Sequence, residues 1–287
     1  MKSKRKVKSR SKKSQSGLKP TFIHIVLAIA LILGFAYWII VAKTATATTP
    51  KTALIYGDSL TWESMSHITQ QFAKKSGWTR YVHAFPSTPP CLWNTWLAAD
   101  LAQYNPSVVA LTTAANTYNA SYPCMVDSNG NPLVMGTPEY YAKYESDLNT
   151  FFATVTATGA KVVYVKAPPM LDPVRNAAII EIANRATQAA GNYHGVSISN
   201  VVRAALAKNG KYTATKPCLA IEASLPDCVN NTITIRTITG PQTGLHLCPG
   251  GLPDVYPFFC KTYSSGEYRF GKNLVNTIVN PPPPILP

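Results

Sequence analysis

The stretch Thr52–Thr61 reads Thr-Ala-Leu-Ile-Tyr-Gly-Asp-Ser-Leu-Thr, and the rest of the chain can be interpreted outward from it. Its apolar first half predicts a buried strand, and the Gly-Asp-Ser that follows predicts a tight turn into a helix. Ser59 would then lie at the carboxyl edge of a strand, where open α/β sheets bind their ligands. The N–H groups that open the next helix would stabilise negative charge developing beside it. An ordinary Asp-Ser helix cap is the alternative interpretation.

Strands and helices alternate along the rest of the chain. Apolar runs predict strands over residues 52–57, 78–85, 107–112, 161–165 and 195–198, and helical spacing predicts helices over 62–75, 93–104, 137–158, 174–190, 201–208 and 266–279. This alternation is typical of a parallel sheet covered by helices on both faces. Residues 211–263 have no regular pattern, which indicates a functional or disulfide-stapled segment.

The first fifty residues do not resemble a globular domain. Residues 1–20 hold nine of the 27 Lys and Arg residues and no acid, which leaves 18 bases against 13 acids in the remainder. Residues 22–42 contain no Asp, Glu, Lys or Arg, and a run of this length can cross a bilayer as a helix. The basic flank orients the N-terminus towards the cytoplasm.

These features predict five parts: a basic cytoplasmic tail (1–21), a transmembrane helix (22–42), a linker (43–50), a folded domain outside the cytoplasm (51–280) and a Pro-rich tail without fixed structure (281–287). A cleaved signal peptide, cut near Ala47, is the alternative, and the protein would then be secreted. The basic tail has no interleaved aromatic residues, so we expect a membrane partner and no nucleic acid.

Six cysteines lie in the predicted exported part: Cys91, Cys124, Cys218, Cys228, Cys248 and Cys260. An even number in that compartment predicts disulfides, although fifteen connectivities are open. Pairing of close neighbours suggests Cys218–Cys228 and Cys248–Cys260, which leaves Cys91–Cys124. A metal site is the rival interpretation, but no Cys-x-x-Cys spacing supports it.

Three polar residues are expected at one edge of the sheet. Ser59 ends the first strand, Asn116 follows the third, and His246 lies in the irregular segment near the C-terminus. The carboxyl ends of parallel strands face one crevice. A serine nucleophile, a histidine base and an amide donor are the groups that acyl transfer needs.

These residues resemble the SGNH/GDSL hydrolase family over residues 51–279. Gly-Asp-Ser-Leu at 57–60 matches its first block, Ala-Asn at 115–116 lies where its oxyanion Asn is found, and Thr-Gly-Leu-His at 243–246 lies where Asp-x-x-His is usual. The segments 90–93, 245–249 and 264–269 look like a bacterial envelope-associated branch. The resemblance implies a flavodoxin-like three-layer α/β/α sandwich with a parallel sheet. It also implies Ser59 as nucleophile, His246 as base and Asn116 as oxyanion donor.

The chain departs from the family's pattern at three positions, of which the mildest is Ala115 or Ala114 in place of the Gly that often precedes the Asn. Thr243 replaces the acid before the histidine, and Thr243 itself, a backbone carbonyl or Asp254 is the candidate substitute. Ser87 replaces the oxyanion glycine of the second block, and its backbone N–H would still serve as a donor.

The resemblance implies a membrane-anchored serine esterase or O-acyltransferase that needs no metal or cofactor. Its expected substrate is an acylated glycan or lipid of the cell envelope. The alternative is an inactive member of the family that binds envelope glycan or a membrane partner.

Overall fold

The computed structural model describes residues 25, 29–35, 50–117, 120, 123–249, 260 and 263–285. The chain divides into two units, Met1–Thr49 and Pro50–Pro287. In the first unit, residues 25 and 29–35 are helical and exposed. Among the helices described, none combines the length and the apolar character that a membrane span requires. The predicted transmembrane helix over 22–42 lies mostly outside the described residues, as do the tail 1–21 and linker residues 43–49.

The second unit is built on a five-stranded parallel sheet, as predicted. Its strands are β1 (Lys51–Gly57), β2 (Trp78–Ala84), β3 (Val108–Thr113), β4 (Lys161–Lys166) and β5 (Val196–Ser199), in the order β2-β1-β3-β4-β5. All six residues of β3 are buried, because helices cover both faces of a sheet of this kind. The position of β1 between β2 and β3 puts the Ser59 turn between the loops that follow those two strands.

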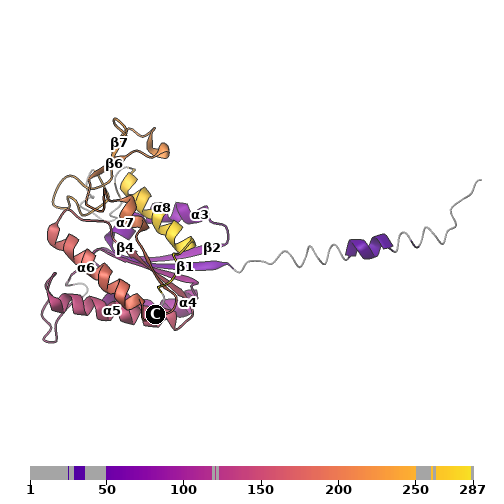
Figure 1. The fold of residues 1–287 in the computed structure, drawn as a ribbon, viewed down its shortest axis with the longest axis horizontal. Coiled ribbons are helices and arrows are strands. Elements are labelled where there is room, and N and C mark those ends of the chain that lie inside the picture. The colour runs from indigo at the N-terminus through magenta and orange to yellow at the C-terminus, as the bar shows by residue number, and fades with distance from the viewer. Residues whose placement is uncertain are drawn as a thin grey trace, which may run out of the picture. The chain divides into compact units, whose positions relative to one another are not determined.

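Helices form a layer on each side of this sheet (Figure 1). One layer holds α4 (Pro90–Tyr104), α5 (Pro138–Thr156) and α6 (Pro173–Ala190), and the other holds α2 (Ser59–Glu63), α3 (Met65–Ala73), α7 (Val201–Ala205) and α8 (Ser265–Val279). Within the layers α5 packs between α4 and α6, and α8 packs against α2, α3 and α7. The arrangement is a three-layer α/β/α sandwich.

The structure differs from the predicted elements in two places. The helix predicted over 62–75 is two helices, because the chain breaks at Ser64 between α2 and α3. The irregular segment contains a small antiparallel pair, β6 (Thr215–Pro217) with β7 (Thr232–Thr234), and the 3₁₀ helix η1 (Ala220–Glu222).

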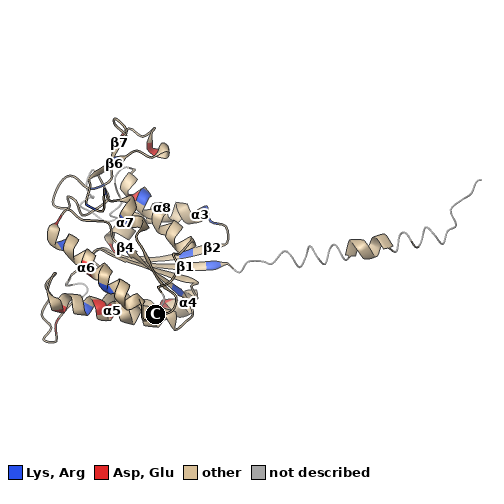
Figure 2. Cartoon of the chain, in the orientation of Figure 1, with Lys and Arg blue, Asp and Glu red and all other residues tan. Residues whose placement is uncertain are grey.

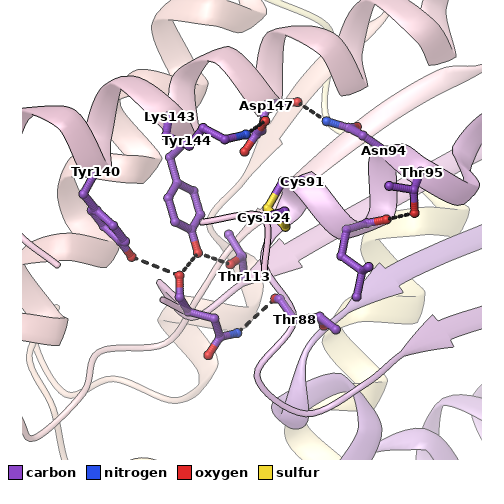
Figure 3. Close-up of a disulfide and its surroundings, with 12 residues drawn as sticks. Thr88, Cys91, Asn94, Thr95, Thr113, Cys124, Tyr140, Lys143, Tyr144 and Asp147 are labelled. Atoms are coloured by element: carbon purple, nitrogen blue, oxygen red, sulfur yellow. Dashed lines mark hydrogen bonds and ion pairs between the residues drawn. A yellow bond between two sulfur atoms is a disulfide. The ribbon is translucent and has the colours of Figure 1, made fainter. Parts of the chain in front are cut away.

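The three predicted disulfides are confirmed: Cys91–Cys124, Cys218–Cys228 and Cys248–Cys260. Cys91 lies in the first turn of α4, and its partner Cys124 lies in the loop between β3 and α5 (Figure 3). This bridge ties the loop after β2 to the loop after β3, and both loops carry predicted site residues.

The prediction that the Pro-rich tail lacks fixed structure is wrong for residues 281–285. Ser197 Oγ donates to the Pro282 carbonyl at 2.8 Å, and Ile285 N–H donates to the Val196 carbonyl at 3.0 Å. Because β5 is an edge strand, the tail covers backbone groups that would otherwise lie unpaired.

Candidate active site

A cavity of about 330 Å³ opens at the carboxyl edge of the sheet. It is lined by Ser59, Trp62, Glu63, Pro86, Ser87, Ala114, Asn116, Arg175, Gln242, Leu245 and His246. The four residues predicted from the sequence, Ser59, Ser87, Asn116 and His246, are therefore all brought to one pocket. They come from four separate segments of the chain, so the fold and not the local sequence assembles them.

Ser59 is presented by a tight turn from β1 into α2. Asp58 caps the helix by accepting from Leu60 N–H at 3.1 Å, and Ser59 is the first helical residue and half-buried. Gly57 is required here because a Cβ at that position would lie 2.0 Å from Thr61 Oγ1. The turn thus holds the Ser59 hydroxyl at the floor of the pocket, where a substrate can reach it.

His246 is held by a glutamate that the sequence analysis missed. Its ring atom Nδ1 bonds Glu63 Oε1, and the other carboxylate oxygen of Glu63 accepts from Leu247 N–H at 2.9 Å. Glu63 is 1% exposed and His246 6%. An ionised carboxylate only accepts, so this contact favours the tautomer with the hydrogen on Nδ1, in which Nε2 is the acceptor atom of the ring.

Thr243 does not take the part of the missing acid. Its side chain is exposed, and its hydroxyl donates to the Gly240 carbonyl at 2.6 Å and not to the histidine ring. Asp254 lies outside the described residues. The signal that could have identified Glu63 is its spacing: it follows Ser59 by four residues and therefore shares a helix face with it.

No hydrogen bond joins Ser59 Oγ to the His246 ring among the residues that the structure describes. Both side chains line the same cavity. Nucleophile–base hydrogen bonds are often longer in enzymes without substrate and tighten when substrate binds.

A buried carboxylate, Asp58, connects the Ser59 turn to the loop after β3. Its Oδ2 accepts from Ala114 N–H at 2.6 Å and from Asn116 Nδ2 at 3.0 Å. Burial raises the pKa of Asp58 to about 6, against the lowering effect of the hydrogen bonds from Ala114 and Leu60. Asp58 is therefore a structural tie and not the partner of the histidine.

Asn116 is fixed from several sides. Its Nδ2 also donates to the Thr88 carbonyl at 3.1 Å, so both amide hydrogens are engaged. Its backbone carbonyl accepts from the hydroxyl groups of Tyr144 at 2.7 Å and Tyr140 at 3.3 Å, which project from α5 (Figure 3). This network sets the loop after β3 at the rim of the pocket.

Two non-glycine residues at the pocket adopt the left-handed backbone region. Ser87 has φ 61° and Ala115 has φ 58°, a conformation that is costly for residues with a Cβ. Arg175 donates to the carbonyls of Ala114 at 2.9 Å and Ala115 at 3.3 Å, which supports the second of these turns. Strained residues of this kind are concentrated at functional sites.

A fully buried arginine supports the loop that carries His246. Arg236 donates to the Pro169 carbonyl at 2.6 Å and to the Leu245 carbonyl at 3.3 Å. Burial lowers its pKa to about 10, so it remains charged at neutral pH. Charged residues are otherwise sparse and scattered over the ribbon of the second unit (Figure 2).

The metal interpretation finds no support in the described residues. Cys248, Cys260 and Glu267 lie close enough to share an ion, but the two sulfur atoms form a disulfide and cannot act as thiolates.

Comparisons with known proteins place the chain in a family without an assigned activity. A family model described as "Protein of unknown function (DUF459)" matches residues 52–220. The match includes Ser59, Glu63 and Asn116 and ends before His246. None of the curated proteins matches the sequence.

Several solved structures of low identity are similar to part of this chain. One is LAE5, an alpha/beta hydrolase enzyme from the metagenome of Lake Arreo in Spain, at 14% identity over 55% of this chain and 79% of that chain, with a TM-score of 0.41. A catalytic mutant of Axe2, an acetylxylan esterase from Geobacillus stearothermophilus, is 12% identical over 55% of this chain and 78% of that chain, with a TM-score of 0.41. The psychrotrophic esterase EstA from Pseudoalteromonas sp. is 18% identical over 55% of this chain and 85% of that chain, with a TM-score of 0.38. Likenesses this distant carry no argument about activity.

Proposed function

The chain belongs to the DUF459 family, and because the description of that family assigns no function, we propose one from the geometry of the site. The protein is a serine ester hydrolase or O-acyltransferase in which Ser59 is the nucleophile, His246 the general base and Glu63 the residue that orients the base. The observation that carries this proposal is the buried contact between Glu63 and His246 Nδ1 in the pocket that Ser59 lines.

The proposed first step forms an acyl-enzyme. His246 Nε2 takes the hydroxyl proton while Ser59 Oγ attacks the carbonyl carbon of the ester, and the carbonyl oxygen becomes an oxyanion. The intermediate collapses, the bond to the alcohol oxygen breaks, and the alcohol leaves with the proton from His246. Water, or an acceptor hydroxyl in a transferase, then attacks acyl-Ser59 by the same route and restores the free hydroxyl.

Backbone N–H groups are the proposed oxyanion donors. Ser59 N–H lies at the start of α2, and Ser87 lines the pocket from the loop after β2. Donors fixed before the reaction stabilise the developing charge without reorganisation. Asn116 is proposed as a third donor. For this its side-chain amide would exchange its hydrogen bond to the Thr88 carbonyl for one to the oxyanion.

A fluorophosphonate probe tests the nucleophile directly. We expect the purified full-length protein to be labelled on Ser59, as located by peptide mass spectrometry, and to hydrolyse p-nitrophenyl acetate. Ser59→Ala and His246→Ala should abolish both, whereas Ser146→Ala, on the exposed face of α5, should change neither. Absence of labelling, or equal rates for the wild type and Ser59→Ala, would leave the binding-only alternative.

The location and the substrate class are proposed from the sequence. Residues 22–42 anchor the protein in the cell membrane with its N-terminus inside, and the substrate is an ester on a glycan or lipid of the envelope. The three disulfides support an oxidising compartment for the second unit. Protease treatment of intact spheroplasts should digest the second unit. A mature N-terminus near Ala47 would instead support the secreted form.

A further inference from the structure

A second cavity, of about 360 Å³, lies between the end of β2 and the outer face of α4. It is lined by His83, Phe85, Thr95, Trp96, Ala99 and Asp100. None of these residues takes part in the reaction proposed above. The proposed reaction therefore does not explain the presence of this cavity.

Aromatic rings connect this cavity to the catalytic pocket. Trp62 lines the catalytic pocket and packs on Phe85, with ring centroids 5.8 Å apart. Phe85 lines the second cavity and meets Trp96 at 5.6 Å. A molecule that occupies both sites would thus cross a continuous aromatic surface.

The row of rings continues along the edge strand β2. His83 meets Tyr104 at 6.1 Å, and Tyr104 stacks on Tyr81 at 3.8 Å. Tyr81 is 38% exposed and Phe85 36%. Exposed aromatic residues on an edge strand or just after it invite unwanted association, so the grouping of Phe85 with Trp96 at a cavity indicates a ligand.

A carboxylate gives the cavity polar character. Asp100 is 6% exposed. Its Oδ2 accepts from the Tyr56 hydroxyl and lies 2.8 Å from His83 Nδ1. Asp100 also lines the cavity, so its carboxylate is available there as a hydrogen-bond acceptor. One acceptor beside several ring faces suits a ligand with both an apolar face and hydroxyl groups.

We propose that this second cavity is a saccharide subsite, which holds a neutral sugar ring of a glycan while an acyl ester on that glycan enters the catalytic pocket. The inference rests on the proposed esterase function and names its substrate class. The faces of Trp96 and Phe85 take the C–H face of the ring, and Asp100 accepts from a sugar hydroxyl. An alkyl chain fits less well, because it would cover the Asp100 carboxylate without offering it a hydrogen-bond donor.

Binding to the inactive full-length variant Ser59→Ala tests the subsite separately from catalysis. The probes are β-1,4-linked tetrasaccharides of glucose, xylose and N-acetylglucosamine, and tryptophan fluorescence is the signal. We expect at least one of them to bind. The affinity should fall at least tenfold when Trp96→Ala or Asp100→Asn is added, and Trp96→Phe should restore most of it. Thermal unfolding should show that each variant is folded.

Tyr263→Ala is the matched control, because Tyr263 is 39% exposed and does not line the cavity. Its affinity should equal that of the parent. The proposal is overturned if no tetrasaccharide binds, if Trp96→Ala binds as well as the parent, or if only decanoate competes for the site, which would assign the cavity to an acyl chain. If the proposed esterase function is wrong, the fluorophosphonate probe will not label the wild type, so the two proposals fail in different experiments.

Discussion

At the scale of single residues, Glu63 determines which nitrogen of His246 can act. Glu63→Gln would keep the bond from Leu247 N–H but would present an amide N–H to Nδ1. The ring would then hold its hydrogen on Nε2, where it cannot take the Ser59 proton. We expect kcat to fall by about 10⁴-fold, as in a triad whose orienting acid is replaced by its amide, with little change in KM.

Steady-state kinetics with p-nitrophenyl acetate measures the effect of this substitution. Glu139→Gln is its control, because Glu139 is exposed in the first turn of α5. A Glu63→Gln enzyme with wild-type kcat would mean that the carboxylate is only structural.

The left-handed conformation of Ser87 predicts a substitution that stabilises the protein. A Cβ in this region costs roughly 1–2 kcal/mol, whereas the greater freedom of an unfolded glycine costs about 0.4–1 kcal/mol. Ser87→Gly should therefore raise the free energy of unfolding by about 0.5–1 kcal/mol. Ser146→Gly, inside α5, should lower it by about 0.5–1 kcal/mol. Chemical denaturation compares the two, and equal signs would contradict the strain argument.

At the scale of elements, the start of α8 supports the loop that carries His246. Ser264 caps α8 by accepting from Glu267 N–H at 3.2 Å, and its hydroxyl donates to the Leu247 carbonyl. A Cβ on Gly266 would lie 2.2 Å from the Ile235 carbonyl and 2.9 Å from the Leu247 carbonyl. The packing of this helix therefore depends on a residue without a side chain.

Gly266→Ala should consequently reduce both stability and activity. Overpacking of this kind costs about 1–3 kcal/mol, and movement of Leu247 would displace its neighbour His246. Gly191→Ala is the matched control, because its Cβ meets only the Gln188 carbonyl, at 3.3 Å. Thermal unfolding and ester turnover of the two variants check the prediction, and it fails if they behave alike.

Glu267, in the first turn of α8, makes stability depend on pH. Burial is the main reason that its pKa rises to about 8, and the nearby charge of Glu63 adds to it. The folded protein then binds this proton more tightly than the unfolded chain does. The contribution of Glu267 to stability is present below the ordinary pKa of about 4.5 and is lost as the pH rises to 8.

Glu267→Gln should remove this dependence. Between pH 5 and pH 8 the melting temperature of the wild type should fall by a few degrees more than that of the variant, because each kcal/mol shifts the melting temperature by about 2–4 °C in a domain of this length. Differential scanning calorimetry at the two pH values gives the comparison. Parallel curves would show that Glu267 is ionised in the folded state.

At the scale of the whole molecule, the disulfide Cys91–Cys124 joins two loops of the proposed site. It closes a separation of 33 residues, and native bridges of this kind contribute about 2–5 kcal/mol. The double variant Cys91→Ser/Cys124→Ser should lose stability in that range and should also lose activity, since Ser87 and Asn116 lie in the loops it ties. Cys218 and Cys228 do not line the pocket. The variant that lacks their disulfide should therefore lose stability but keep its activity.

The architecture could be predicted from the sequence because its signals are local. The buried strand Val108–Thr113 is a near-continuous apolar run, and the three disulfides join the cysteines that were expected to pair. The Pro-rich tail was predicted incorrectly because its order depends on hydrogen bonds to Val196 and Ser197, which are far away in the sequence. Glu63 was missed because its partner His246 lies 183 residues along the chain; its spacing of four residues from Ser59 places it on the same helix face but does not identify that partner.

The short helix that holds both Ser59 and Glu63 also changes how relatives of this protein should be sought. A search that requires a carboxylate three positions before the histidine would discard such sequences as inert. The pattern Gly-Asp-Ser-x-x-x-Glu would retrieve them, and it needs only seven codons of gene sequence. Fragmentary reads that end long before the histidine codon could therefore still be sorted by their expected chemistry.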